Sequence, residues 1–259
     1  MNEFLIVYDD YKSSLARSLS NIMKIKAVPL KIEKDDVGRV RVKVELEEAK
    51  RFIYLGGFYV PYDESLTKNV LALSTLSDRG VVEAAVISPL PFHKSTKPVE
   101  ISFFSQMVRT LWGAKKFITF DLVPPEKLGY FRAEAVSLSA FPFLTEYVLN
   151  KWKSATVKAL DRELDAIVEA MRLRLKENGV KLLLDVEVIS SDFLDEEVFR
   201  SSKEGKVLFT THLLTEPEPI LERVEELITT NLVECKKLKG LKVLDVAPAI
   251  KEYLGLLML

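Results

Sequence analysis

A short apolar run that ends at an aspartate and is soon followed by two prolines constrains the fold of this chain most. Lys116–Phe120 has the length and the apolar, β-branched content of a buried strand. Asp121 follows directly, and Pro124 and Pro125 prevent a helix from starting at once. Ligands collect where the strands of open α/β sheets end, so Asp121 is a candidate binding residue. An aspartate in this position can equally be a loop or helix-capping residue.

Strand-like runs alternate with helical patterns in the first half of the chain. The expected strands are Phe4–Tyr8, Lys26–Leu30, Val40–Leu46, Phe52–Leu55, Ala84–Ser88 and Lys116–Phe120. Apolar stripes at helical spacing lie between them, one after Ser13 and one over Leu66–Leu73. This order predicts an α/β fold with a mostly parallel sheet covered by helices on both faces.

The same alternation returns near Ala140. A helical pattern covers Leu144–Val148, a long amphipathic stripe covers Leu160–Leu175, and a closing helix is expected over Ala249–Leu257. The expected strands are Thr156–Val157, Leu182–Ile189, Lys206–Thr210, Ile228–Thr230 and Lys242–Leu244. The chain is therefore predicted to form two tandem α/β domains, residues 1–139 and 140–259.

Composition excludes several classes of protein. The chain has 37 basic and 38 acidic residues and no basic run, so we expect no nucleic-acid partner. No apolar run approaches the roughly 20 residues that span a bilayer, so we expect no membrane association. A single cysteine, Cys235, excludes an internal disulfide and fits a cytoplasmic protein. Two histidines and one cysteine give no zinc pattern.

Several motifs, in order and spacing, resemble those of phosphoribosyl pyrophosphate (PRPP) synthetases. Asp121–Val123 followed by Leu128–Phe131 is similar to the family's Asp-Leu-His triplet and the aromatic segment after it. Val86–Lys97 is similar to the family's segment that ends in Arg-Gln-Asp-Arg-Lys. Further similar segments are Lys24–Val44, Thr156–Asp161, Phe209–Leu214, Ile228–Asn231 and Val243–Leu254. The resemblance implies two tandem phosphoribosyltransferase-like domains, each a mostly parallel sheet flanked by helices, and assembly into a homo-oligomer.

The resemblance also implies a magnesium site, which this chain matches only in part. Asp121 and Asp161 stand at the positions of metal-binding carboxylates in the family. Val123 stands where the family has its metal-binding histidine, and its side chain cannot bind a metal. Since Mg²⁺ prefers oxygen ligands and keeps several waters, a reduced site on the two carboxylates stays open.

The nucleotide-binding motifs are changed as well. Lys94–Lys97 reads Lys-Ser-Thr-Lys where the family has Arg-Gln-Asp-Arg, which keeps two charges but loses the guanidinium forks. Asp36 matches the aspartate of the family's Phe-x-Asp-Gly-Glu segment. His93 can contact a phosphate or can be an exposed loop residue without a role. We expect a nucleotide, sugar phosphate or other anion to bind, if at all, at His93, Lys94, Lys97 and Asp36.

The family's Thr-Gly-Gly-Thr loop for the ribose phosphate has no counterpart between Ile189 and Lys206. The glycines that let backbone approach a phosphate are missing there, and three consecutive acidic residues would repel it. Two functions stay open. The first is a non-catalytic regulatory, binding or structural homologue, with an active PRPP synthetase among its candidate partners. The second is a divergent but active ribose-phosphate diphosphokinase. An unrelated ligand in the same cleft is a third possibility.

Apolar residues in expected loops and at the end of the sequence give some independent indication of a homo-oligomer. They are Phe58, Tyr59, Val60, Tyr62, Phe141, Pro142, Phe143 and the leucine-rich Leu254–Leu259. Aromatic side chains in loops are enriched at interfaces. The alternative is that these residues cover the core of their own subunit.

Overall fold

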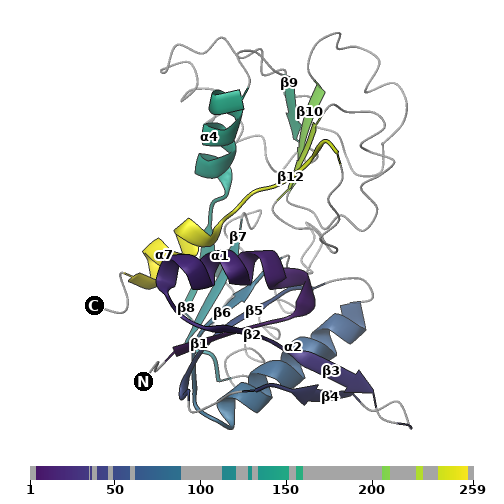
Figure 1. The fold of residues 1–259 in the computed structure, drawn as a ribbon, viewed down its shortest axis with the longest axis vertical. Coiled ribbons are helices and arrows are strands. Elements are labelled where there is room, and N and C mark those ends of the chain that lie inside the picture. The colour runs from purple at the N-terminus through teal and green to yellow at the C-terminus, as the bar shows by residue number, and fades with distance from the viewer. Residues whose placement is uncertain are drawn as a thin grey trace. The chain divides into compact units, whose positions relative to one another are not determined.

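The computed structural model in Figure 1 describes residues 4–34, 36, 40–45, 49–58, 62–88, 113–120, 128–129, 134–151, 156–159, 206–210, 226–229 and 239–255. The chain divides into two compact units. One unit comprises Met1–Leu138 together with Ala247–Leu259, and the other comprises Ser139–Val246. The closing helix therefore belongs with the N-terminal half of the chain.

Six parallel strands form the sheet of the first unit, in the order β2-β1-β5-β6-β7-β8. Their bounds are Phe4–Tyr8 (β1), Ala27–Pro29 (β2), Arg51–Gly56 (β5), Val81–Ile87 (β6), Lys116–Phe120 (β7) and Glu134–Leu138 (β8). The expected α/β fold with a mostly parallel sheet is confirmed. Strand β8 was not predicted from the sequence, whereas β7 has the predicted bounds.

Helices cover both faces of this sheet, as Figure 1 shows. Helix α2 (Tyr62–Ser77) packs on β5 and β6, and helix α1 (Ser13–Met23) packs on β1 and β2 and against α7 (Ala247–Gly255). One buried cluster joins α2 to the sheet through large side chains that include Leu5, Phe52, Tyr54, Leu73 and Phe117. The alternate residues of the same strands, such as Ile6, Ile53, Leu55 and Ile118, are also fully buried. Burial on both faces explains why these strands read as continuous apolar runs.

An antiparallel hairpin of β3 (Lys31–Lys34) and β4 (Val40–Lys43) follows β2. Its apolar residues Ile32 and Val42, and Val44 just after it, pack against the cluster under α2. Its other face carries charged side chains. Strand β3 was not predicted, because three of its four residues are charged.

The second unit contains a sheet of four parallel strands in the order β12-β11-β10-β9. The strands are Thr156–Ala159 (β9), Lys206–Thr210 (β10), Glu226–Thr229 (β11) and Leu241–Val243 (β12), and helix α4 covers Phe141–Lys151. The expected helix over Leu160–Leu175 and strand over Leu182–Ile189 lie outside the described residues. No helix in the described segments is both long and apolar enough to cross a membrane.

Two of the residues considered for an oligomer interface lie in the core of their own unit. Phe58 and Leu254 are each 2% exposed, and Phe58 belongs to the cluster under α2. For these two residues the structure supports the alternative interpretation. Tyr59, Val60 and the last four residues lie outside the described part of the chain.

Gly80 provides a test of the packing between the ends of α2 and β6. A Cβ atom at Gly80 would lie 2.2 Å from the backbone oxygen of Lys50, which accepts a hydrogen bond from Val81 N at 2.7 Å. Because that oxygen is held by the sheet, we expect Gly80→Ala to lower the free energy of unfolding by about 1–3 kcal/mol. A Cβ at Gly129 would meet nothing within 4 Å, so Gly129→Ala is the matched control. Equal stability of both variants in urea unfolding would contradict the described packing.

Candidate functional site

The carboxyl ends of β1 and β5 meet where the strand order reverses. From β1 the chain first adds β2 on one side and later adds β5 on the other. In open α/β sheets this switch point is where ligands bind, outside the carboxyl ends of the strands. All six strands are parallel, so the segments that leave β1, β5, β6 and β7 do so at this same edge.

Two buried charged residues lie just beyond the end of β1. Asp9 follows the strand directly and Lys12 ends the short 3-10 helix η1 (Asp10–Lys12), and each is 7% exposed. The Asp9 Oδ1 atom accepts a hydrogen bond from Tyr11 N at 2.9 Å and so caps this helix. Its other carboxylate oxygen accepts no hydrogen bond from any residue that the structure describes.

Burial moves the pKa values of this pair toward neutrality. It raises the pKa of Asp9 to about 6, although the positive charge of Lys12 opposes the rise. It also lowers the pKa of Lys12 to about 8, although the charge of Asp9 opposes the fall. Buried acid–base pairs with shifted pKa values are concentrated at functional sites, and this one lies at the edge where ligands are expected.

A hydrogen-bond network anchored by Asn69 supports the loop after β5. Asn69 accepts from the Tyr54 hydroxyl at 3.0 Å and donates to the backbone oxygens of Gly57 at 2.8 Å and Ser65 at 2.7 Å. Gly56 must lack a side chain, because a Cβ there would lie 2.4 Å from Asn69 Oδ1. Burial, and then the nearby Asp9, raise the pKa of Tyr54, so its hydroxyl stays protonated as a donor. The network fixes the backbone beside Asp9.

The opposite, amino edge of the sheet carries ion pairs instead. Glu83, which stands at a register shift between β5 and β6, accepts from Arg51 Nε at 2.9 Å and from Lys115 Nζ at 3.1 Å. Desolvation alone would raise the pKa of Glu83, but the hydrogen bonds from the two cations outweigh it and lower that pKa. The Arg51 guanidinium also stacks over the Phe4 ring, 4.2 Å from its centroid. These paired charges join neighbouring strands and are structural.

The second unit has a comparable cluster at the amino end of β11. Glu226 is 4% exposed and accepts hydrogen bonds from Lys151 Nζ at 2.6 Å and from the Tyr147 hydroxyl. Lys242 Nζ lies 5.1 Å from the centroid of the Tyr147 ring. Burial, followed by the hydrogen bond to Glu226, raises the pKa of Tyr147. This cluster fastens α4 to the sheet of its unit and was not predicted from the sequence.

Of the site residues predicted from the sequence, the structure describes only Asp36, an exposed residue in the turn region between β3 and β4. His93, Lys94, Lys97, Asp121 and Asp161 lie outside the described residues. Within the described segments no three histidine, cysteine, aspartate or glutamate side chains group as metal ligands.

Asp9 and Lys12 were not predicted as site residues from the sequence, although the sequence contains a pattern that indicates Asp9. Asp9 follows the apolar run Phe4–Tyr8 as directly as Asp121 follows Lys116–Phe120. The rule that identified Asp121 therefore also identifies Asp9. Nothing in the sequence pattern indicates that the Lys12 ammonium group is buried.

The class that these observations define is a two-unit α/β protein with parallel sheets. Its fold is similar to that of a solved structure described as phosphoribosylpyrophosphate synthetase from Mycobacterium smegmatis, with a TM-score of 0.69 over 99% of each chain. Sequence identity to that protein is 15%, so the likeness concerns the fold alone. No protein-family model and no curated protein matches the chain. The expected PRPP synthetase-like fold is thus supported by structure and not by sequence comparison.

The buried carboxylate predicts a specific pH dependence of stability. Because the folded-state pKa of Asp9 is raised from 3.8 to about 6, its favourable contribution is complete below pH 3.8 and is lost as the pH rises through about 6. Asp9→Asn cannot ionise and keeps a capping side chain. The free energy of unfolding of the wild type should decrease between about pH 4 and pH 7. The decrease for Asp9→Asn over the same range should be smaller by roughly 2 kcal/mol.

The matched control is Asp10→Asn, which removes the exposed neighbouring carboxylate. It should keep most of the wild-type pH dependence in urea unfolding, because Asp10 is the smallest of the causes that shift the pKa of Asp9. A wild-type profile in Asp9→Asn would show that Asp9 is not the buried titrating group.

Proposed function

We propose that this chain is a PRPP synthetase-like protein that has lost diphosphoryl transfer and acts as a binding, regulatory or structural homologue. The observation that carries the proposal is the simultaneous change of three motifs in a chain whose fold is similar to PRPP synthetase over its full length. The metal-binding histidine, the arginine-rich segment and the glycine-rich phosphate loop are all replaced.

The bounds of two described strands support the proposal that these motif residues are replaced. Strand β7 ends at Phe120, so Asp121 and Val123 begin the segment that follows it. Strand β6 ends at Ile87, ahead of the Lys-Ser-Thr-Lys sequence. These two strand ends lie where the motif comparison expects them, and this agreement supports the proposal that the motif residues are replaced.

The replaced residues matter because phosphoryl transfer depends on positioning and on charge neutralisation. Asp121 and Asp161 would hold Mg²⁺ through carboxylate oxygens, and the ion would neutralise phosphate charge. Lys94 and Lys97 supply point charges without the bidentate geometry of arginine. Without a glycine-rich loop, backbone amides cannot approach a sugar phosphate as closely. Binding of a phosphorylated ligand is therefore retained more easily than catalysis.

The second candidate function is a divergent, active ribose-phosphate diphosphokinase. The specific observation in its favour is that both carboxylates, Asp121 and Asp161, are kept. In that case they and the two lysines Lys94 and Lys97 would carry metal and ATP.

An activity assay distinguishes the two functions. Purified protein with ATP, ribose 5-phosphate and Mg²⁺ should release no AMP above the rate of a protein-free control. The reason is that the histidine, arginine and glycine groups that stabilise the transition state are absent. Turnover that Asp121→Ala abolishes would establish the active alternative.

Residual anion binding should depend on the two lysines at the family positions. In calorimetry with ATP, Lys94→Ala/Lys97→Ala should weaken affinity by about tenfold or more, since hydrogen bonds from charged donors are the stronger ones. Lys239→Ala/Lys251→Ala removes two exposed lysines elsewhere and serves as the control. Equal affinities of the two double variants would argue against this anion site.

We also propose that the protein is a homodimer or a larger oligomer. Assembly depends on the shape of the fold and not on catalytic residues, so an oligomer surface can be retained where diphosphoryl transfer is lost. An active PRPP synthetase is a further candidate partner. Light scattering at micromolar concentration should give a mass of at least twice the 29.4 kDa of one chain. A monomer mass over that range would refute the proposal.

A further inference from the structure

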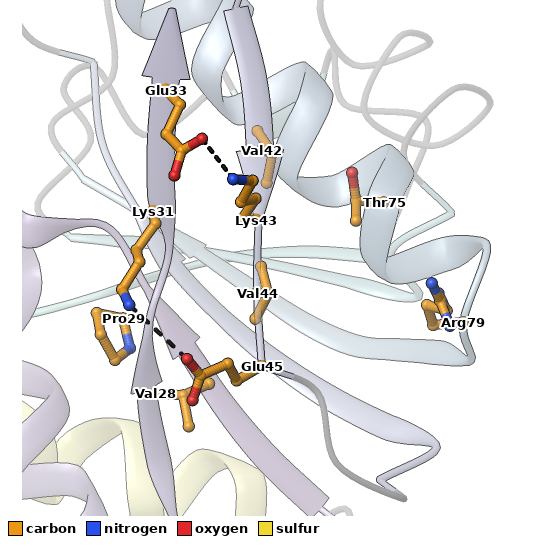
Figure 2. A pocket seen from close by; sticks show the side chains of 10 residues that line it. All are labelled: Val28, Pro29, Lys31, Glu33, Val42, Lys43, Val44, Glu45, Thr75 and Arg79. Atoms are coloured by element: carbon orange, nitrogen blue, oxygen red, sulfur yellow. Dashed lines mark ion pairs between the residues drawn. The ribbon is translucent and has the colours of Figure 1, made fainter.

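A groove of about 810 Å³ lies between the β3–β4 hairpin, strand β2 and the end of α2. Figure 2 shows the side chains that line it. Val28, Val42 and Val44 give it an apolar surface, and Val42 and Val44 also pack against the cluster under α2. Its volume is within the range of sites for small organic ligands. Seven of its ten lining residues belong to the segment Lys24–Val44, but none of the predicted metal- or anion-binding residues lines it.

The charged residues of the hairpin that line this groove neutralise one another. Lys43 Nζ lies 2.6 Å from Glu33 Oε2, and Lys31 Nζ lies 3.7 Å from Glu45 Oε1, as the dashed lines in Figure 2 mark. The two lysines are direct partners in the β3–β4 register, so each glutamate also relieves the repulsion between them. These four side chains leave no net charge on the hairpin side of the groove.

Arg79 is the remaining charged residue of the lining. It lies in the turn after α2, and its guanidinium has no ion pair or hydrogen bond with any residue in the described part of the chain. Thr75 lies one helical turn before it and also lines the groove. The lining therefore combines an apolar surface with one cation whose charge is not balanced by a described carboxylate.

We propose that this groove binds a small organic anion with a single charged head group and an apolar body. A guanidinium forms paired hydrogen bonds to a carboxylate or a phosphate, and the Thr75 hydroxyl can donate a further one. The apolar body would lie along the valines. One available cation fits a singly charged head group better than a polyphosphate, which needs several cations for neutralisation. The site is independent of the proposed function.

Two fluorescent probes separate the charged and the apolar parts of the site. 8-Anilinonaphthalene-1-sulfonate carries one negative charge, and N-phenyl-1-naphthylamine has the same ring system without it. The wild type should bind the sulfonate saturably at one site. Arg79→Ala should weaken that binding about tenfold or more and change the affinity for the neutral probe less than twofold. Val44→Ser should weaken the binding of both probes, because it removes apolar contact between the groove and the ring system.

Arg17→Ala is the matched control, since it removes an exposed arginine from α1. It should bind both probes as the wild type does, and thermal unfolding should confirm that all variants are folded. Octanoate and mono-octyl phosphate, added as competitors, identify the preferred head group, and displacement of the sulfonate by at least one of them is expected. Equal sulfonate affinity of Arg79→Ala and Arg17→Ala, no saturable binding by the wild type, or displacement by neither competitor would overturn the proposal.

Discussion

The parallel pairing of β5 between β1 and β6 is the constraint on which the rest of the first unit depends. β5 pairs along its length with both neighbours, and its residues Phe52–Leu55 are fully buried. A strand buried on both faces leaves polar side chains only the two edges of the sheet. The helices must then cover both faces, and the polar groups must gather at the strand ends.

Charged side chains at the two edges of the sheet differ in their pairing and burial. At the amino edge, Glu83 is satisfied by two cations, and Lys116 Nζ lies 2.6 Å from Glu134 Oε1. At the carboxyl edge, Asp9 and Lys12 are buried and have pKa values moved toward neutrality. Satisfied pairs stabilise the sheet, whereas a desolvated acid–base pair at a switch point is suited to interaction with a ligand.

The sequence predicted the bounds of two strands as the structure has them, Lys116–Phe120 and Lys206–Thr210. Short runs that are mostly apolar or β-branched leave few alternatives to a strand. β8 was missed because its sequence Glu-Ala-Val-Ser-Leu is only partly buried and mixes polar with apolar residues. Asp9 could have been predicted by the rule that identified Asp121, but the burial of Lys12 and the groove beside Arg79 could not, since burial of charged groups and the pairing of a hairpin's charges depend on tertiary packing. Asp36 could be placed at the turn region of the hairpin, but the other predicted site residues lie outside the described part of the chain.

We infer that ligands bind at the carboxyl edge of the six-stranded sheet and that the amino edge is structural. Hydrogen exchange followed by mass spectrometry, with and without ATP and Mg²⁺, tests it most directly because it reports on both edges in one measurement. With ligand bound, we expect slower exchange in the peptides that directly follow β1, β6 and β7, and unchanged exchange around Arg51, Glu83 and Lys115. Protection confined to the amino edge, or bound ATP without protection after any of these strands, would contradict it.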